Sequence, residues 1–273
     1  MIVDAHQHFW RIGENDCTWP TPDLAAIHRD FEPAELAALA APLGVAGSVL
    51  VQSQPSDRDT QWLLNLADRT PFVEAVVGWA DLKAGGAARR IADLAARPKL
   101  RGLRPMLQSL PEDWIVDPAL DPAIEAMKAH RLSLDALVFT RHLPNLEVFA
   151  SRNPDLPIVI DHAAKPPIAS GALDPWRGRM ERMAALPNVS CKLSGLLTEA
   201  APGQGADALA PYVTHLVEIF GPSRLMWGSD WPVLGLACDY AQWLEMARTL
   251  SGVSDGAARA ALFSGTARAF YCV

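Results

Sequence analysis

Two histidines stand two positions apart near the start of the chain, in the segment His6-Gln7-His8. If this segment ends a β-strand, the two side chains face the same way, with Cα atoms about 7 Å apart. Two imidazoles in that arrangement can share one metal ion or one substrate oxygen. A chance pair at the start of a loop is the plainer alternative. We favour a functional pair because the chain has only 7 His in 273 residues.

Two more reactive groups follow apolar runs. His162 comes directly after the run 157–160 and Asp161, and Asp230 follows the run 225–228. A lone histidine is often structural, and an aspartate after a strand is often a helix N-cap. Pro232 makes a simple cap less favourable, and an unpartnered carboxylate beside a buried strand is unstable. We therefore interpret both residues as functional.

A repeated pattern of strands and helices must position these groups. The β-branched apolar runs are typical of buried parallel strands, and we predict eight of them: 2–8, 47–52, 73–80, 100–104, 133–138, 157–161, 189–193 and 225–228. Apolar residues at helical spacing fill the gaps, in 33–43, 60–67, 86–96, 122–129, 146–151, 176–186, 208–220 and 240–250, with a tail of two helices broken near 264–265.

Eight strand–helix units in 273 residues give about 34 residues each, which is the arithmetic of a (β/α)₈ barrel. A doubly wound open sheet is the alternative, but it usually has a glycine-rich phosphate turn after its first strand. Here Gln7-His8-Phe9-Trp10 occupies that place. The predicted fold class is therefore α/β, a single TIM barrel domain over residues 1–273. In such barrels the active site lies at the carboxyl ends of the strands.

Composition narrows the class of protein. Half of the residues are hydrophobic and a fifth are charged, which excludes a disordered chain. The net charge is −7, from 24 Lys and Arg against 31 Asp and Glu. That balance argues against a nucleic-acid or anionic-membrane partner, and we expect a small-molecule partner instead.

The chain ends and cysteines predict a cytoplasmic location. The first residues lack the basic and apolar regions of a signal peptide. The longest nearly apolar run, 36–51, is interrupted by Pro42, Gly44 and Gly47 and does not read as a membrane span. The four cysteines are scattered without a CxxC pair, as expected for free thiols in a reducing compartment.

Taken together, the motifs resemble the amidohydrolase superfamily, and within it the branch of lactonases that act on sugar-acid lactones and on 2-pyrone-4,6-dicarboxylate. The resemblance spans nearly the whole chain and rests on five segments: Ile2–Trp10, Arg101–Arg104, Asp161–Pro166, Lys192–Gly195 and Trp227–Pro232. It implies hydrolysis of a small lactone, for example an L-fucono- or L-rhamnonolactone. Asp230 would activate the water, His162 would polarise the carbonyl, and His6 and His8 would add donors.

The chain differs from those amidohydrolases that bind two metal ions. Their fourth strand ends in a bridging Lys or Glu, where this chain has Arg104, a fixed cation that would repel a second metal ion. The fifth strand offers Leu134-Asp135-Ala136 and no His before His142. The resemblance therefore implies at most one zinc ion on His6, His8 and Asp230, or no metal at all. Thr266 stands where we expect Asn in this family, and we interpret the difference as a change in local helix capping.

A second group of residues is predicted to bind the substrate. Arg104 suits a carboxylate or a hydroxyl-rich ligand, with a salt bridge at the barrel mouth as the alternative. We assign the same role to other polar or aromatic residues at predicted strand ends: Gln54, Trp79, Lys165 and Trp231. The roles of Lys192 and His142 stay open, as does a homo-oligomeric state.

Three other functions fit the same residues. The chain could hydrolyse a pyrone or muconolactone, an intermediate of aromatic degradation. It could be a zinc-dependent decarboxylase on the same scaffold. It could also be a barrel that binds a small ligand without catalysis, in which case the four converging groups would have no use. A hydrolysis screen of aldonolactones with and without a chelator separates these functions.

Overall fold

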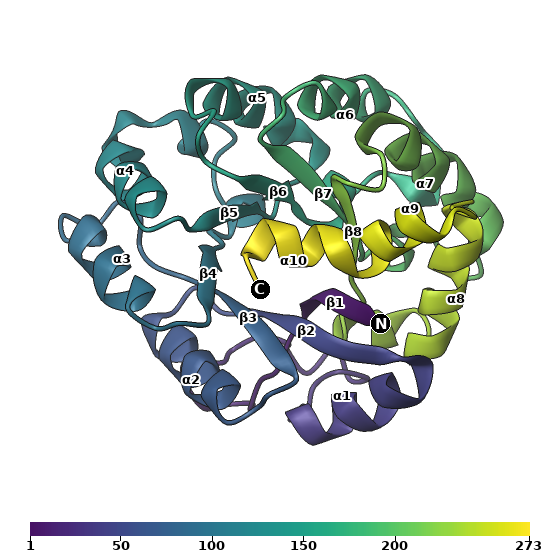
Figure 1. Ribbon diagram of the computed structural model, residues 1–273, viewed down its shortest axis with the longest axis horizontal. Helices are drawn as coiled ribbons and strands as arrows, with labels where there is room; N and C mark the ends of the chain where they lie inside the picture. Colours follow the sequence, from purple (N-terminus) through teal and green to yellow (C-terminus); the bar gives the residue numbers. More distant parts are fainter.

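A closed parallel β-barrel forms the centre of the molecule (Figure 1), as a computed structural model of residues 1–273 shows. Eight strands form one sheet in sequence order, and every neighbouring pair is parallel. The strands are β1 (Ile2–Gln7), β2 (Val45–Val51), β3 (Val73–Gly78), β4 (Leu100–Leu103), β5 (Ser133–Ala136), β6 (Ile158–Ile160), β7 (Val189–Leu193) and β8 (Leu225–Trp227).

The first and last strands meet at their carboxyl ends. The His8 N–H donates to the Trp231 carbonyl, and the Asp230 N–H donates to the His6 carbonyl, each at 2.8 Å. These bonds close the barrel beside the predicted reactive groups. The predicted (β/α)₈ TIM barrel is confirmed.

Helices surround the barrel, and each predicted position holds one (Figure 1). They are α1 (Pro33–Ala40), α2 (Asp57–Asp68), α3 (Ala87–Ala95), α4 (Asp121–Ala129), α5 (Leu143–Arg152), α6 (Trp176–Ala184), α7 (Ala206–Phe220) and α8 (Tyr240–Leu250). No helix is both long enough and apolar enough to cross a membrane.

The chain ends in a helical segment that lies across one mouth of the barrel (yellow in Figure 1). It consists of α9 (Gly256–Ala260), a widened π-helical turn (Ala261–Gly265) and α10 (Thr266–Tyr271). The predicted pair of helices is present, and the interruption near 264–265 is this π-helical turn and not a break in the chain's helical path, since Gly265 keeps helical angles, φ −61° and ψ −41°. Arg268 of α10 binds Glu74, the second residue of β3, at 2.5 Å. This segment therefore covers the amino-terminal end of the barrel, opposite the predicted site.

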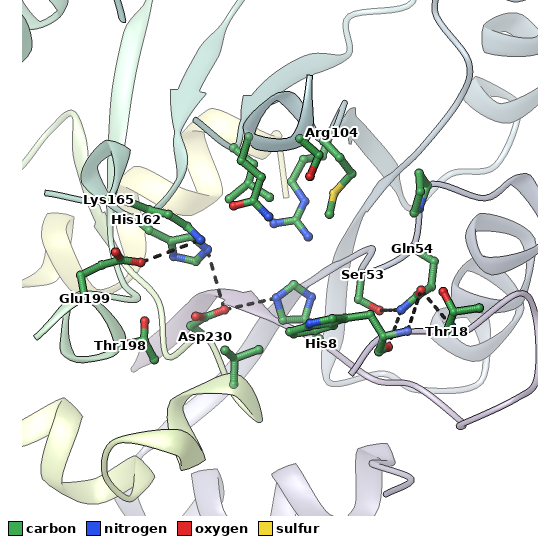
Figure 2. Close-up of a pocket in the computed structure, with 17 residues that line it drawn as sticks. His8, Thr18, Ser53, Gln54, Arg104, His162, Lys165, Thr198, Glu199 and Asp230 are labelled. Carbon is green, nitrogen blue, oxygen red and sulfur yellow. Dashed lines mark hydrogen bonds and ion pairs between the residues drawn. The ribbon is translucent and has the colours of Figure 1, made fainter. Parts of the chain in front are cut away.

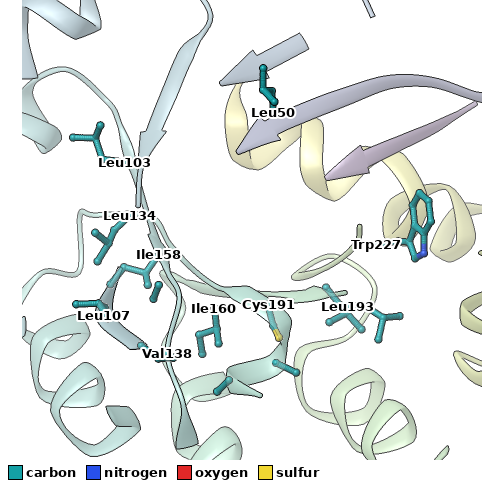
Figure 3. Close-up of a cluster of buried hydrophobic side chains, with 14 of the residues drawn as sticks. Leu50, Leu103, Leu107, Leu134, Val138, Ile158, Ile160, Cys191, Leu193 and Trp227 are labelled. Atoms are coloured by element: carbon teal, nitrogen blue, oxygen red, sulfur yellow. The ribbon is translucent and has the colours of Figure 1, made fainter. Parts of the chain in front are cut away.

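Apolar side chains fill two regions on either side of the barrel wall. The outer one lies between strands and helices and includes Leu103, Leu134, Ile158 and Trp227 (Figure 3). The inner one holds small residues of the strands, such as Val3, Ala5, Val49, Val51, Ala75 and Val77, together with Tyr271 of α10.

A bulge in β1 changes which side chains face the interior. Asp4 pairs with Ser48 and Gln7 pairs with Leu50, so three steps along β1 match two along β2. An extra residue of this kind re-aims the side chains that follow it. Ala5 lies in the inner apolar region, and the next residue, His6, also reaches the interior, where it contacts Lys192.

Candidate active site

Three of the four predicted reactive groups, His8, His162 and Asp230, line a cavity of about 410 Å³ at the carboxyl ends of the strands (Figure 2). The fourth, His6, is fully buried and does not line it. Of the 17 residues that line it, only four are hydrophobic, so the wall suits a hydroxyl-rich ligand. The polar and charged lining residues include His8, Thr18, Ser53, Gln54, Arg104, Gln108, His162, Lys165, Thr198, Glu199 and Asp230.

His8 is held in one orientation by the backbone of β2. Its Nδ1 lies 2.8 Å from the Val51 carbonyl, which can only accept, so Nδ1 carries a proton. In the neutral imidazole the Nε2 lone pair then faces Asp230 Oδ1 at 3.2 Å and His6 Nε2 at 3.2 Å. A lone pair and a carboxylate oxygen repel at that distance. A proton or a metal ion must therefore lie between these groups.

His162 sits on an unusual turn after β6. Four consecutive residues, 162 to 165, have left-handed backbone angles with φ between 50° and 60°, which for L-residues is unfavourable by about 1–2 kcal/mol each. Burial of Ala163 and Ala164, and a 2.7 Å bond from Trp176 Nε1 to the Ala163 carbonyl, hold the turn in place. It points both His162 and Lys165 into the cavity. Such strain is typical of functional sites.

The His162 ring also has a defined partner. Its Nδ1 lies 2.9 Å from Ser194 Oγ, and its Nε2 lies 3.8 Å from Asp230 Oδ1. If the Ser194 hydroxyl donates to Nδ1, Nε2 carries the proton towards the cavity. Burial lowers the pKa of His162 to about 4, although Asp230 and Asp161 oppose that shift. The imidazole is therefore neutral at pH 7 and acts as a donor without bringing a charge.

Asp230 is the ionised group among these histidines. Burial alone would raise the pKa of its carboxyl, but His162, His8 and His6 together hold that pKa well below its usual range. Its φ of +59° turns the chain sharply after β8 and aims the carboxylate at the cavity. The site thus presents one fixed negative charge beside three imidazole rings.

Below the cavity, a buried network of charges fills the barrel. Lys192 Nζ lies 2.6 Å from Asp135 Oδ2, 3.0 Å from Asp161 Oδ1 and 3.2 Å from His6 Nδ1. Both predicted roles of Lys192, inward contact with the site and pairing with a carboxylate, are thus present together. Burial would raise the pKa of Asp161, but Lys192 and His6 hold it well below its usual value. This network fixes the His6 ring from beneath.

Arg104 joins that network to the cavity wall. Its Nη1 lies 3.3 Å from Asp161 Oδ2 and 3.5 Å from His6 Nε2, and its Nη2 donates to the Gln52 carbonyl. Its Nε is buried and has no partner. Arg104 is therefore neutralised by Asp161 while it keeps one donor unused.

The donor set fits one divalent metal ion. His6, His8 and Asp230 each offer one ligand atom, and these atoms lie 3.2 to 3.7 Å apart. Nitrogen ligands of a tetrahedral zinc ion are about 3.3 Å apart, given Zn–N bonds of about 2.0 Å. Nε2 of His8 carries a lone pair and no proton, so it cannot donate a hydrogen bond to the Asp230 carboxylate that it faces. A metal ion between the two atoms would interact favourably with both, which supports the same fit. His6, Asp161 and His162 form a second group of this kind.

The residues predicted to bind substrate divide into two sets. Arg104, Lys165 and Gln54 line the cavity. Gln54, however, uses its amide to hold the loop that carries Trp19: Nε2 donates to the Trp19 carbonyl at 2.7 Å, and Oε1 accepts from the Thr18 N–H at 3.2 Å.

Trp79, Trp231 and His142 lie outside the cavity wall. The backbone N–H and carbonyl of Trp79 bond Thr60 Oγ1 of α2, at 2.8 and 3.0 Å. The left-handed turn at Asp230 directs Trp231 towards Phe31, with ring centroids 5.2 Å apart. His142 Nδ1 accepts from the Phe139 N–H at 3.1 Å and stabilises a turn after β5. Their positions give none of the three a contact with a ligand in this cavity.

Sequence reasoning missed eleven of the 17 lining residues, and three of these have large side chains: Trp19, Gln108 and Glu199. All three lie in loops or short 3₁₀ turns beyond the strand ends, where no periodic pattern marks them. Their distance past a strand end, about five residues for Gln108 and six for Glu199, was the one available signal.

Comparison with known proteins agrees with this geometry. A family model described as "Amidohydrolase" matches residues 3–273. This chain belongs to the amidohydrolase family. It is 54% identical over 274 residues to a protein named L-fucono-1,5-lactonase from Burkholderia ambifaria, with 98% of this chain and 94% of that protein covered. It is 36% identical to a protein of the same name from Burkholderia multivorans, with 100% and 96% covered.

A solved structure resembles this amidohydrolase closely. It is an amidohydrolase from Burkholderia multivorans, described with bound zinc, and it superposes with a TM-score of 0.94 at 36% identity. The match covers 100% of this chain and 99% of the other. The amidohydrolase described here is thus an enzyme of that family, with the same fold and a donor set that can hold a divalent ion.

Proposed function

We propose that this amidohydrolase hydrolyses a sugar-acid lactone, with L-fuconolactone and L-rhamnonolactone as the first substrates to test. The observation that carries the proposal is the ionised Asp230 carboxylate, which lies within 3.2 Å of His8 and 3.8 Å of His162 at the wall of a polar cavity. The names of the two relatives from Burkholderia support the same reaction.

Lactone hydrolysis needs three events: deprotonation of a water, polarisation of the ring carbonyl and protonation of the departing alkoxide. Asp230 accepts the proton from water, because it is ionised and faces the cavity, and later returns it to the alkoxide. His162 donates from Nε2 to the carbonyl oxygen as negative charge develops there.

A metal ion fits this scheme without being required by it. His6, His8 and Asp230 would hold one zinc ion, which supplies Lewis acidity and a lower pKa for a bound water. The fixed His8 ring and the network beneath His6 keep both nitrogens in place for that purpose. Arg104, directly after β4, is a cation that cannot act as a ligand of a second metal ion.

The proposal takes residues 1–273 as one barrel domain that works in the cytoplasm on a small-molecule lactone. Lactone hydrolysis ranks above decarboxylation because both relatives compared above are named lactonases. Of the two lactone classes, a sugar lactone ranks above a pyrone or muconolactone, because most residues of the cavity wall are polar.

The test is a panel of aldonolactones, pyrones and muconolactone, read by acid release with a pH indicator. The expected result is hydrolysis of sugar lactones by the wild-type protein and a loss of about 10³-fold or more in Asp230→Asn. Asp155→Asn, an exposed site far from the cavity, is the matched control and should keep full activity. The proposal would be disproved by near-normal turnover in Asp230→Asn, or by a wild-type protein that hydrolyses no lactone of the panel.

A further inference from the structure

Lys165 and Glu199 face each other at the rim of the cavity (Figure 2). Lys165 ends the left-handed turn after β6, and Glu199 ends the 3₁₀ turn Leu197–Glu199 after β7. Lys165 Nζ lies 3.8 Å from Glu199 Oε1, and each side chain is less than a quarter exposed. Two neighbouring strands thus place an opposite-charge pair beside Asp230 and His162.

This pair is close enough to share charge but too far apart for a direct hydrogen bond. Neither the Lys165 ammonium nor the Glu199 carboxylate has a hydrogen-bond partner elsewhere in the structure. The ammonium instead lies 5.2 Å from the centre of the Phe139 ring. Both heads therefore keep free hydrogen-bonding positions. A hydroxyl group fits between such heads, because it donates to a carboxylate and accepts from an ammonium at once.

The charges around the cavity leave no surplus cation. Four charged side chains line it: Arg104, Lys165, Glu199 and Asp230. Arg104 is neutralised by Asp161 at 3.3 Å, and Lys165 by Glu199. Asp230 is the fourth charge, and it is the one that would also hold a zinc ion. A ligand with its own carboxylate or sulfonate would therefore find no free side-chain cation in this wall.

We propose that Lys165 and Glu199 form a hydroxyl-binding subsite, and that Glu199 restricts this enzyme to uncharged, polyhydroxylated lactones. The proposal rests on the lactone hydrolysis proposed above and adds a specificity residue to it. Glu199 acts twice: it accepts a hydrogen bond from a substrate hydroxyl, and it cancels the positive charge that would otherwise attract an acidic lactone.

The test compares two lactones that differ in one group. One is L-galactono-1,4-lactone, and the other is the hexarolactone with the same ring, in which the terminal CH₂OH is a carboxylate. For the wild type we expect kcat/KM to favour the neutral lactone by about 100-fold. Glu199→Gln keeps the shape of the side chain and frees the Lys165 charge. We expect it to reduce that preference to about tenfold or less, with a higher kcat/KM for the acidic lactone.

Two further variants complete the design. Lys165→Met leaves Glu199 unpaired and should move the preference the other way, further against the acidic lactone. It also keeps the test valid if Glu199→Gln unfolds, which thermal unfolding would show. Glu245→Gln is the matched control: it removes an exposed carboxylate of α8 that lies 3.4 Å from Arg248, and it should leave the preference unchanged.

Each outcome bears on a different statement. The role of the pair is overturned if the preference for the neutral lactone stays within twofold of the wild-type value in both Glu199→Gln and Lys165→Met. It is also overturned if the wild-type enzyme prefers the acidic lactone. If the wild type hydrolyses neither these lactones nor any other, the proposed function itself fails and this proposal fails with it. Hydrolysis with an unaltered preference rejects the subsite alone.

Discussion

The Tyr271 hydroxyl, third from the end of the chain, donates a 2.6 Å hydrogen bond to Asp135 Oδ2 inside the barrel. Asp135 in turn binds Lys192 at 2.6 Å, and Lys192 contacts His6 Nδ1 at 3.2 Å. Three contacts therefore connect the helix that covers one end of the barrel to a histidine at the other end. Because the groups are buried, each depends on its partner to satisfy a charge or a polar atom.

Removal of the Tyr271 hydroxyl should weaken this connection. Tyr271→Phe keeps the ring and leaves Asp135 without one donor, so we expect a loss of about 2 kcal/mol in the free energy of unfolding, the size typical of a bond to a charged group. Tyr212→Phe is the control, because that hydroxyl bonds only neutral carbonyls, Ala172 at 3.1 Å and Pro167 at 3.5 Å. Urea unfolding of both variants gives the comparison. Equal losses in the two would contradict the special role of Asp135.

Much of this arrangement follows from sequence patterns, and some of it does not. Apolar runs predict all eight strands because both faces of a barrel wall are buried. The reactive residues next to strand ends, His8 and Asp230, follow from the same rule. Trp231 illustrates the limit: it adjoins a strand end, but the positive φ of Asp230 turns it into the apolar layer.

Local sequence also fails where tertiary packing overrides preference. Ala163 and Ala164 have no tendency towards left-handed angles, yet both adopt them because the turn is buried under Trp176. The orientation of Lys165 depends on that turn, and so does its distance to Glu199. A pair formed by two irregular turns leaves no periodic signal in a single sequence.

Gly195 provides a sharp test of how His162 is positioned. A Cβ atom at this position would lie 2.5 Å from His162 Nδ1, so Gly195→Ala must displace the ring. We expect a loss of activity of at least about 100-fold, because a shift of about 1 Å in a catalytic group has that effect. Gly203→Ala is the matched control. Gly203 also has a positive φ, +85°, but nothing lies within 4 Å of its would-be Cβ.

The two glycine variants share backbone strain and differ in the clash with His162. Both should lose about 1 kcal/mol or more of stability from the left-handed backbone, and only Gly195→Ala should lose activity. The measurements are kcat on a sugar lactone and the thermal unfolding temperature. Full activity of Gly195→Ala would show that the position of His162 does not limit the reaction.

Asp59 of α2 should make stability depend on pH. Burial raises the pKa of its carboxyl to about 7, from 3.8, although backbone donors at Gln54 and Ser53 oppose the shift. The folded state therefore holds a proton that the unfolded chain releases, so folding becomes less favourable as pH rises from about 4 to 7. Asp59→Asn removes this titration and keeps an oxygen acceptor.

The comparison of the two proteins isolates that one group. Between pH 5.5 and pH 8.5 the wild type should lose about 2 kcal/mol of unfolding free energy relative to Asp59→Asn, at about 1.4 kcal/mol per pH unit up to the folded pKa. Urea unfolding at both pH values measures it. A constant difference between the proteins across this range would mean that Asp59 stays ionised in the fold.

Zinc binding should depend on His8 and not on histidine in general. Since the Val51 carbonyl holds His8 with its Nε2 lone pair towards His6 and Asp230, we expect one zinc ion per chain and a rise in unfolding temperature when zinc is added. His8→Ala should weaken zinc binding by at least about 100-fold and abolish that rise. His130→Ala, an exposed position at the end of α4, should bind zinc like the wild type.

Equilibrium dialysis with metal analysis measures the stoichiometry and affinity of zinc binding. Unchanged zinc binding by His8→Ala would place the ion elsewhere, with His6, Asp161 and His162 as the next donor set to vary.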